Sequence, residues 1–209
     1  MSKKTRIKQH ILNYNPVADT ATYEITNAPI LDQRFRNLPQ AIQNEFNALS
    51  EQAETNSATV IPRLLELVES YPLPLIYSCL AIAYGRVDPK KQKLIIAENY
   101  QKNPRNIFAR CNYARLCLAE NNTDEIPKIF DNQIDLKSLY PKRNQFHITE
   151  YTAFTSVFCQ YYAAKHQPEQ AEELFISMQS VAPESSETQQ IKELLHPTLL
   201  QRINKKLFG

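Results

Sequence analysis

A histidine and a glutamate at metal-binding spacing are the first residues in this chain that could do chemistry. His147 and Glu150 stand three residues apart in a helical pattern, so both side chains would lie on one helix face. Such a pair can supply two metal ligands, but a bundle site needs a matching motif on another helix, and none occurs. We therefore favour a pair of hydrogen-bonding groups at a helix start, and we expect neither a metal nor another cofactor. A metal-dependent enzyme that uses His147 and Glu150 is the less favoured alternative.

Cysteine and glycine usage excludes several other kinds of site. The four cysteines lie in predicted helices and form no CxxC pair: Cys79, Cys111, Cys117 and Cys159. This spacing favours buried free thiols over a disulfide framework or a zinc site, and hence a reducing compartment. The chain has only two glycines, so a Walker loop and a dinucleotide-binding fingerprint are excluded. No strong catalytic constellation remains, and the sequence predicts a non-enzymatic protein.

The charge balance limits the choice of partners. The chain has 209 residues, with 24 Lys and Arg against 22 Asp and Glu, and a formal net charge of +2. This balance does not favour a general nucleic-acid or membrane binder. No apolar run approaches the roughly 18 residues of a membrane span, and the basic N-terminus has no apolar segment after it. We expect a cytoplasmic protein, and self-association stays open.

The residues from 152 to 185 predict two helices joined by a short turn. Phe158 and Tyr162 share a face of the first helix, and Ala171 and Phe175 share a face of the second. Pro168 fits the first turn of the second helix, where its missing N–H costs nothing. Two such helices pack antiparallel and still leave an apolar face that needs neighbours.

This unit resembles the tetratricopeptide repeat, a helix–turn–helix of 34 residues. The matching positions are Phe158 at the leucine site, Cys159 and Ala171 at the small-residue sites, Tyr162 at the tyrosine, Phe175 at the aromatic site and Pro183 at the closing proline. Thr155 and His166 depart from the family's tryptophan-like position and turn glycine. The segment between Pro74 and Pro104 carries a second clear copy. Pro72 and Pro104 lie 32 residues apart, close to the family period.

The resemblance implies an all-α fold, a right-handed α-solenoid of about four tetratricopeptide-like hairpins. We expect an extended N-terminal arm over residues 1–36 and a repeat domain over residues 37–185. The pairs would span about 38–72, 74–104, 107–141 with an irregular insertion at 131–147, and 147–185. Capping helices would follow over residues 186–209, with a capping box at Ser186–Gln189.

The resemblance also implies where a ligand would bind, because the first helices of such repeats line a concave surface that takes a peptide or protein segment. The groove candidates are Phe108, Asn112, Arg115, Ser78, Ile82 and Gln160. Arginine and exposed aromatics are typical interface anchors, so Phe108 and Arg115 come first. Only Asn112 falls at a position of the family's carboxylate clamp, so an internal segment or a helix is the expected ligand.

A second candidate cluster lies where the repeat period is broken: Tyr140, Arg143, Phe146, His147 and Glu150. Insertions in repeat arrays often mark a binding face, although Tyr140 and Phe146 could equally pack a linker. The favoured function is an adaptor, scaffold or chaperone-like module. A helical-repeat RNA binder is the alternative from another class, and it would require salt-dependent phosphate contacts.

Overall fold

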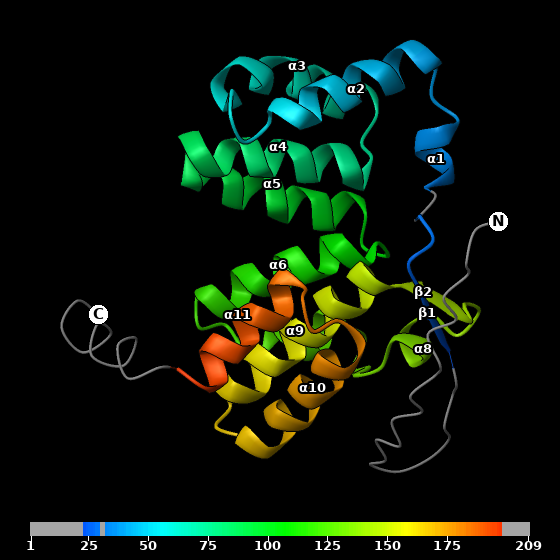
Figure 1. Cartoon of the computed structure of the whole chain (residues 1–209). Helices are drawn as coiled ribbons and strands as arrows, with labels where there is room; N and C mark the ends of the chain where they lie inside the picture. The colour runs from blue at the N-terminus through cyan, green and yellow to red at the C-terminus, as the bar shows by residue number, and fades with distance from the viewer. Residues whose placement is uncertain (1–22, 30–31, 198–209) are drawn as a thin grey trace. The chain divides into compact units, whose positions relative to one another are not determined.

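The fold is mostly helical, with one pair of short strands (Figure 1). The computed structural model describes residues 23–29 and 32–197 of the chain. The strands are β1 (Glu24–Thr26) and β2 (Gln145–His147), and the helices are α1 (Gln33–Arg36), α2 (Gln40–Gln52), α3 (Ser57–Ser70), α4 (Pro74–Val87), α5 (Pro89–Lys102), α6 (Ile107–Ala119), α7 (Glu125–Ile129), α8 (Leu136–Leu139), α9 (Ile148–Ala164), α10 (Pro168–Val181) and α11 (Ser186–Leu195). The all-α prediction is thus confirmed at the level of fold class. Within the described ranges, no helix has the length and apolar composition to cross a membrane.

The chain divides into two compact units, where the sequence suggested one repeat domain over residues 37–185. Among the described residues, the first helical unit lies within residues 29–125, and the second comprises residues 23–28 together with residues 126–197. The segment expected to be an extended arm contains both β1 and the short helix α1. The second unit therefore takes its first strand from one end of the chain and its helices from the other.

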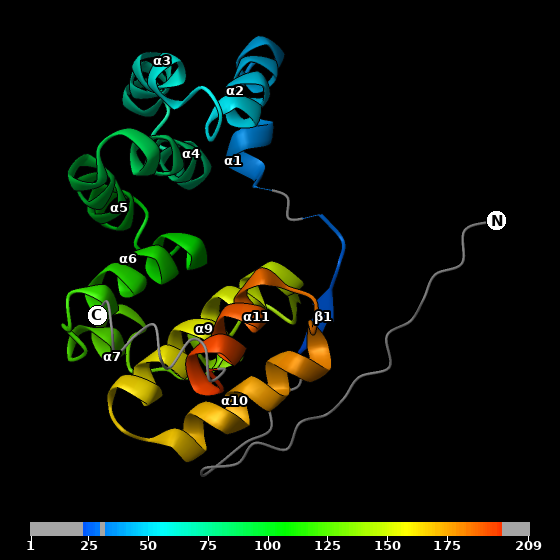
Figure 2. The same ribbon diagram turned by 60° about the vertical axis from the view of Figure 1, so that its left-hand side comes forward.

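Consecutive helices of the first unit pack against each other, α3 on α4 and α4 on α5. Figure 2 shows α3 and α5 to one side of α2 and α4. Prolines occupy the first turns of α4 and α5, at Pro74 and Pro89, where no N–H is needed. Asp88 ends α4 and caps α5, because its carboxylate accepts from the N–H groups of Lys90 and Lys91. The link between these helices is therefore short and well defined.

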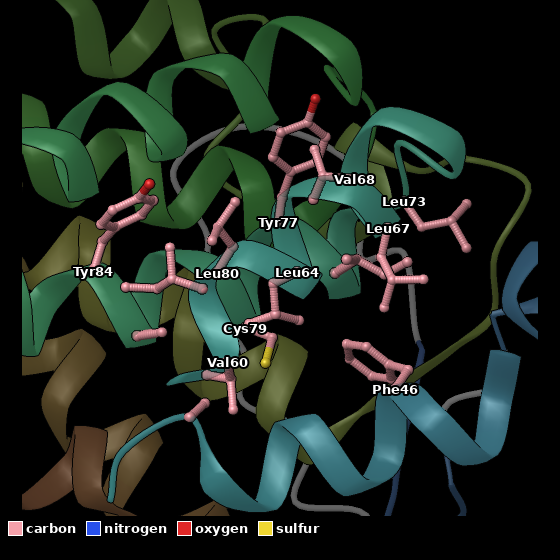
Figure 3. Packing of buried hydrophobic residues seen from close by; sticks show 14 residues of the cluster. Phe46, Val60, Leu64, Leu67, Val68, Leu73, Tyr77, Cys79, Leu80 and Tyr84 are labelled. Carbon is pink, nitrogen blue, oxygen red and sulfur yellow. The ribbon is translucent and has the colours of Figure 1, made fainter. Parts of the chain in front are cut away.

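The core of the first unit lies between α2, α3 and α4 (Figure 3). Phe46 of α2, Leu64 and Leu67 of α3, and Leu80 of α4 are all buried. Tyr77 and Tyr84 of α4 are buried there too. Leu94 of α5, by contrast, is 69% exposed.

Two buried asparagines, Asn99 in α5 and Asn103 at its C-cap, contact the proline-rich link between α3 and α4 and the start of α4. The Asn103 side-chain amide donates to the Pro72 carbonyl (3.2 Å) and to the Asn99 side-chain oxygen (3.1 Å). Asn99 in turn donates to the Pro74 carbonyl (3.4 Å). These two side chains therefore tie the end of α5 to the link and to the first turn of α4. Sequence periodicity does not reveal this role.

The second unit is built on the α9–α10 hairpin, which corresponds to the predicted unit at residues 152–185. α9 begins at Ile148 and is longer than a standard first repeat helix, as the sequence suggested. Phe130, Phe154 and Phe158 form its aromatic core, with ring centroids 4.8–5.3 Å apart. Edge and tilted contacts of this kind add to the stabilisation from apolar burial.

α11 packs on both α9 and α10. Its N-cap is Ser185, whose hydroxyl accepts from the Thr188 N–H (3.1 Å), and not Ser186 as the predicted capping box required. The prediction was displaced by one residue: the helix begins with a single serine cap at Ser185, which has Thr188 and not Glu or Gln three positions later. The last predicted helix, over residues 199–207, and the apolar residues of the arm before residue 23 lie outside the described residues.

His166 closes α9 in a left-handed backbone conformation, with φ at 57°. The Gln167 N–H donates to the Tyr162 carbonyl (2.9 Å) and the His166 N–H to the Ala163 carbonyl (3.2 Å), which is a Schellman ending. α6 ends in the same way at Asn121, with φ at 59°. His166 thus takes the backbone role of the family's turn glycine without glycine's conformational freedom.

Replacing His166 with glycine is expected to stabilise the protein by about 1 kcal/mol, because a residue with a Cβ is strained in the left-handed region. The matched control is Lys165→Gly, whose φ of −83° needs no glycine, and which should lose stability from added chain entropy. Chemical denaturation of both variants measures the two effects. A loss of stability in His166→Gly would show that the side chain contributes more than its backbone strain costs.

Candidate peptide-binding surface

The groove candidates on α4 lie on one exposed stripe. Ile82 is 46% exposed, and Ser78 one turn earlier is half-buried. Leu75, another turn earlier, is 45% exposed and belongs to the same helix face, although the sequence analysis did not single it out. The Ser78 hydroxyl donates to the Pro74 carbonyl of its own helix (2.8 Å). The stripe therefore presents mainly apolar surface.

The candidates on α6 form a second row. Phe108, Asn112 and Arg115 follow at spacings of four and three residues, and all three are half-buried. The Arg115 guanidinium donates to the Asn112 side-chain oxygen (3.3 Å). Cys111 and Ala114 of the same helix are buried. This row combines an aromatic ring with a polar pair.

The two rows belong to the same unit, and α4 contacts α6 directly as well as through α5. We call the exposed stripe Leu75–Ser78–Ile82 and the row Phe108–Asn112–Arg115 the α4–α6 surface. Gln160 is a half-buried residue of α9 in the second unit. The structure therefore assigns five of the six groove candidates to one unit and the sixth to the other.

The second candidate cluster is brought together within the second unit. Arg143 makes two hydrogen bonds to Glu150, from Nη1 to Oε1 (2.9 Å) and from Nη2 to Oε2 (2.6 Å). Its guanidinium lies 4.3 Å from the ring centroid of Phe146 and 5.7 Å from that of Tyr140. Phe146 is buried, and Glu150 is only 4% exposed. A carboxylate buried this deeply requires such a partner.

His147 and Glu150 start α9. The His147 Nδ1 accepts from the Thr149 N–H (3.2 Å), and Glu150 Oε2 accepts from the His147 N–H (2.9 Å). This is a capping box with histidine at the N-cap position. The described residues contain no group of three or more His, Cys, Asp or Glu side chains placed to hold a metal ion. These two side chains serve the helix start and the Arg143 ion pair.

Strand β1 covers this cluster, a contact that the sequence analysis missed. The Tyr23 ring meets Phe146 edge-on, with centroids 5.2 Å apart. Burial raises the pKa of the Tyr23 phenol, and the nearby Asp135 carboxylate adds to the rise. Residues 23 and 146 are too far apart in the sequence for local periodicity to connect them. Phe146 and Glu150 of the cluster are therefore buried within the second unit, while Tyr140, Arg143 and His147 stay partly exposed.

A hollow of about 300 Å³ opens beside β1, at the start of α9 and the end of α10. Its lining includes Asn27, Ile148, Thr152, Val181 and Glu187. Thr152 is almost fully buried and hydrogen-bonds weakly to the Thr149 carbonyl (3.4 Å).

All four cysteines are buried free thiols, as predicted. Burial raises the pKa of the Cys79 thiol to about 11 and that of Cys159 to about 12. Because the thiolate is the reactive form, these residues are poor nucleophiles at neutral pH. They act as small apolar side chains in the helix packing.

Comparison of the chain with protein-family models, with curated proteins and with solved structures finds no match. The fold therefore defines the class of protein no more narrowly than a predominantly helical protein with adjacent packed helices. The tetratricopeptide resemblance stays a prediction, based on the packing residues that suggested it.

Proposed function

We propose that this protein is a non-catalytic binding module that takes a peptide or protein segment on the α4–α6 surface. The observation that carries the proposal is the exposure of two large aliphatic side chains, Leu75 and Ile82, two turns apart on one face of a helix whose other side is deeply buried. Large apolar side chains gathered on one face are typical of an interaction site.

The chemistry of the surface suggests the class of ligand. Leu75, Ile82 and Phe108 offer apolar contacts, while Asn112 and Arg115 add hydrogen-bond donors at one side. A segment with leucine-like residues at helical spacing and a flanking acceptor or carboxylate would match both parts. An adaptor, scaffold or chaperone-like role follows from binding of this kind. The buried free thiols support a reducing compartment, and we propose the cytoplasm.

Ile82→Asp is expected to weaken partner binding at least tenfold, because it places a charge on the apolar stripe. Proteins captured by the wild-type chain from a lysate of the source cell would be identified by mass spectrometry. The affinity of each purified candidate would then be measured by titration against both variants.

The matched control is Leu94→Asp, which places the same charge on α5 at a more exposed position of the same unit. It should leave the affinity within about twofold, as expected for a solvent-exposed site away from the interface. Equal losses in the two variants, or no loss in Ile82→Asp, would exclude the α4–α6 surface as the binding site. Circular dichroism of both variants checks that the helices remain folded.

A further inference from the structure

Strand β1 is the part of the second unit that is separated from it in the sequence. It belongs to residues 1–28, and the rest of the unit begins at residue 126. The residues between them form the first unit. The side-chain contact from Gln145 to Glu24 consequently spans 121 positions.

The site that receives β1 is made by a short segment around β2. The strands are parallel, with Glu24 opposite Gln145, Ile25 opposite Phe146 and Thr26 opposite His147. The Glu24 N–H donates to the Asn144 carbonyl (2.9 Å), and the Gln145 side chain donates to the Glu24 carboxylate (3.3 Å). Tyr23 supplies the edge-on ring contact to Phe146. We call this receiving site the β2 slot.

Every one of these contacts can form equally well when β1 comes from another molecule. The intrachain and the interchain pairing differ in the effective concentration of the strand at the β2 slot. In the intrachain pairing, that concentration is set by the chain that joins the strand to the slot. A two-stranded pair of three residues a side is marginal by itself, so the contact is small enough to break and re-form. High protein concentration then favours exchange by mass action.

The segment that follows β1 is an exposed link at Ala28–Pro29, where the chain can change direction. The boundary between the second unit and the first lies between Ala28 and Pro29. A residue before proline favours extended backbone, and the proline fixes its own φ. Both Ala28 and Pro29 are exposed, so a change of direction here breaks no core contact.

We infer that two copies of this chain exchange their β1 strands in concentrated solution, each placing Tyr23–Thr26 in the β2 slot of the other. The occupant is a second copy, because its own segment already supplies the complementary backbone register and an aromatic ring for Phe146. Exchange of identical segments produces a closed twofold dimer, which is the commonest oligomer symmetry. This inference concerns the second unit and is independent of the proposed α4–α6 surface.

Disulfide trapping tests the exchange. Two full-length variants are prepared separately, Glu24→Cys and Gln145→Cys, at exposed positions that face each other in the strand register. Neighbouring strands lie about 4.8 Å apart, within the Cα separation that a disulfide spans. The native thiols are buried and react slowly. The mixed variants should give a disulfide-linked heterodimer on non-reducing gels, with a yield that rises with protein concentration.

A chance-collision control pairs Glu24→Cys with Gln179→Cys, which is exposed on α10 of the same unit. The proposal requires at least a fivefold higher yield of heterodimer from the β1–β2 pair than from this control. Equal yields at the highest attainable concentration would overturn it. The double variant Glu24→Cys, Gln145→Cys should form an intrachain disulfide when dilute and an interchain one when concentrated; a purely intrachain product at every concentration would also overturn it.

Discussion

Arg143→Ala is expected to destabilise the second helical unit by about 3 kcal/mol, which is one of the two largest effects that this structure predicts. The substitution removes both hydrogen bonds to Glu150 and leaves a nearly buried carboxylate with the His147 N–H as its main remaining donor. Removing one partner of a buried ion pair costs roughly 3–5 kcal/mol, and the lower end applies here because the Arg143 side chain is 40% exposed.

Thermal and denaturant unfolding measure this loss, and hydrogen exchange of the first turn of α9 locates it. Lys142→Ala, at the exposed neighbouring position, is the matched control and should change stability by less than about 0.5 kcal/mol. Arg143→Lys should recover little, because an ammonium cannot make the two parallel hydrogen bonds.

A double-mutant cycle with Glu150→Gln separates the ion pair from the packing of the arginine on Phe146 and Tyr140. The neutral amide no longer needs a cation, so Arg143→Ala should cost at least 1 kcal/mol less in the Glu150→Gln background. An unchanged cost in that background would contradict the proposed role of the buried charge. Equal stability of Arg143→Ala and the wild type would contradict it as well.

Phe158→Ala is expected to cost about 4 kcal/mol, the other large effect. Phe158 is 2% exposed, and its ring centroid lies 5.1 Å from that of Phe130 and 4.8 Å from that of Phe154. Truncation removes buried apolar area and leaves a cavity that two rigid rings cannot fill by moving. It also removes both aromatic contacts.

Phe158→Leu provides the matched comparison, because leucine is the residue that the tetratricopeptide pattern carries at this position. It keeps most of the buried volume and should cost about 1.5 kcal/mol. Ile176→Ala, 52% exposed on α10, is the surface control and should be nearly neutral. Denaturant unfolding should show the largest loss of stability for Phe158→Ala, a smaller loss for Phe158→Leu and almost none for Ile176→Ala. A Phe158→Ala protein as stable as Phe158→Leu would show that the core collapses around the vacancy.

These two predictions also bear on the choice between the candidate surfaces. Arg143, Phe146 and Glu150 combine residue types that are common at interfaces, yet their contacts are made within the second unit. Ile82 and Leu75 have simpler chemistry, but nearly half of each side chain is open. We therefore expect substitutions in the Arg143 cluster to act on stability and substitutions on the α4 stripe to act on binding.

The sequence by itself determined the helical class and most helix positions. Apolar residues at spacings of three and four predicted α4, α9 and α10, and the prolines at 74 and 168 coincide with the starts of α4 and α10. The burial of the four cysteines was predicted from their types and positions as well. These features are readable because helical periodicity and proline geometry depend on residues only a few positions apart.

Only the tertiary structure decided how distant segments meet. Three contacts join residues far apart in the chain: the pairing of β1 with β2, the ring contact of Tyr23 with Phe146, and the hydrogen bond from Asn103 to the Pro72 carbonyl. It also decided that Leu94 faces solvent and that Arg143 pairs with the buried carboxylate of Glu150. A side chain's local pattern says which helix face it occupies, but its burial depends on what the rest of the chain places against that face.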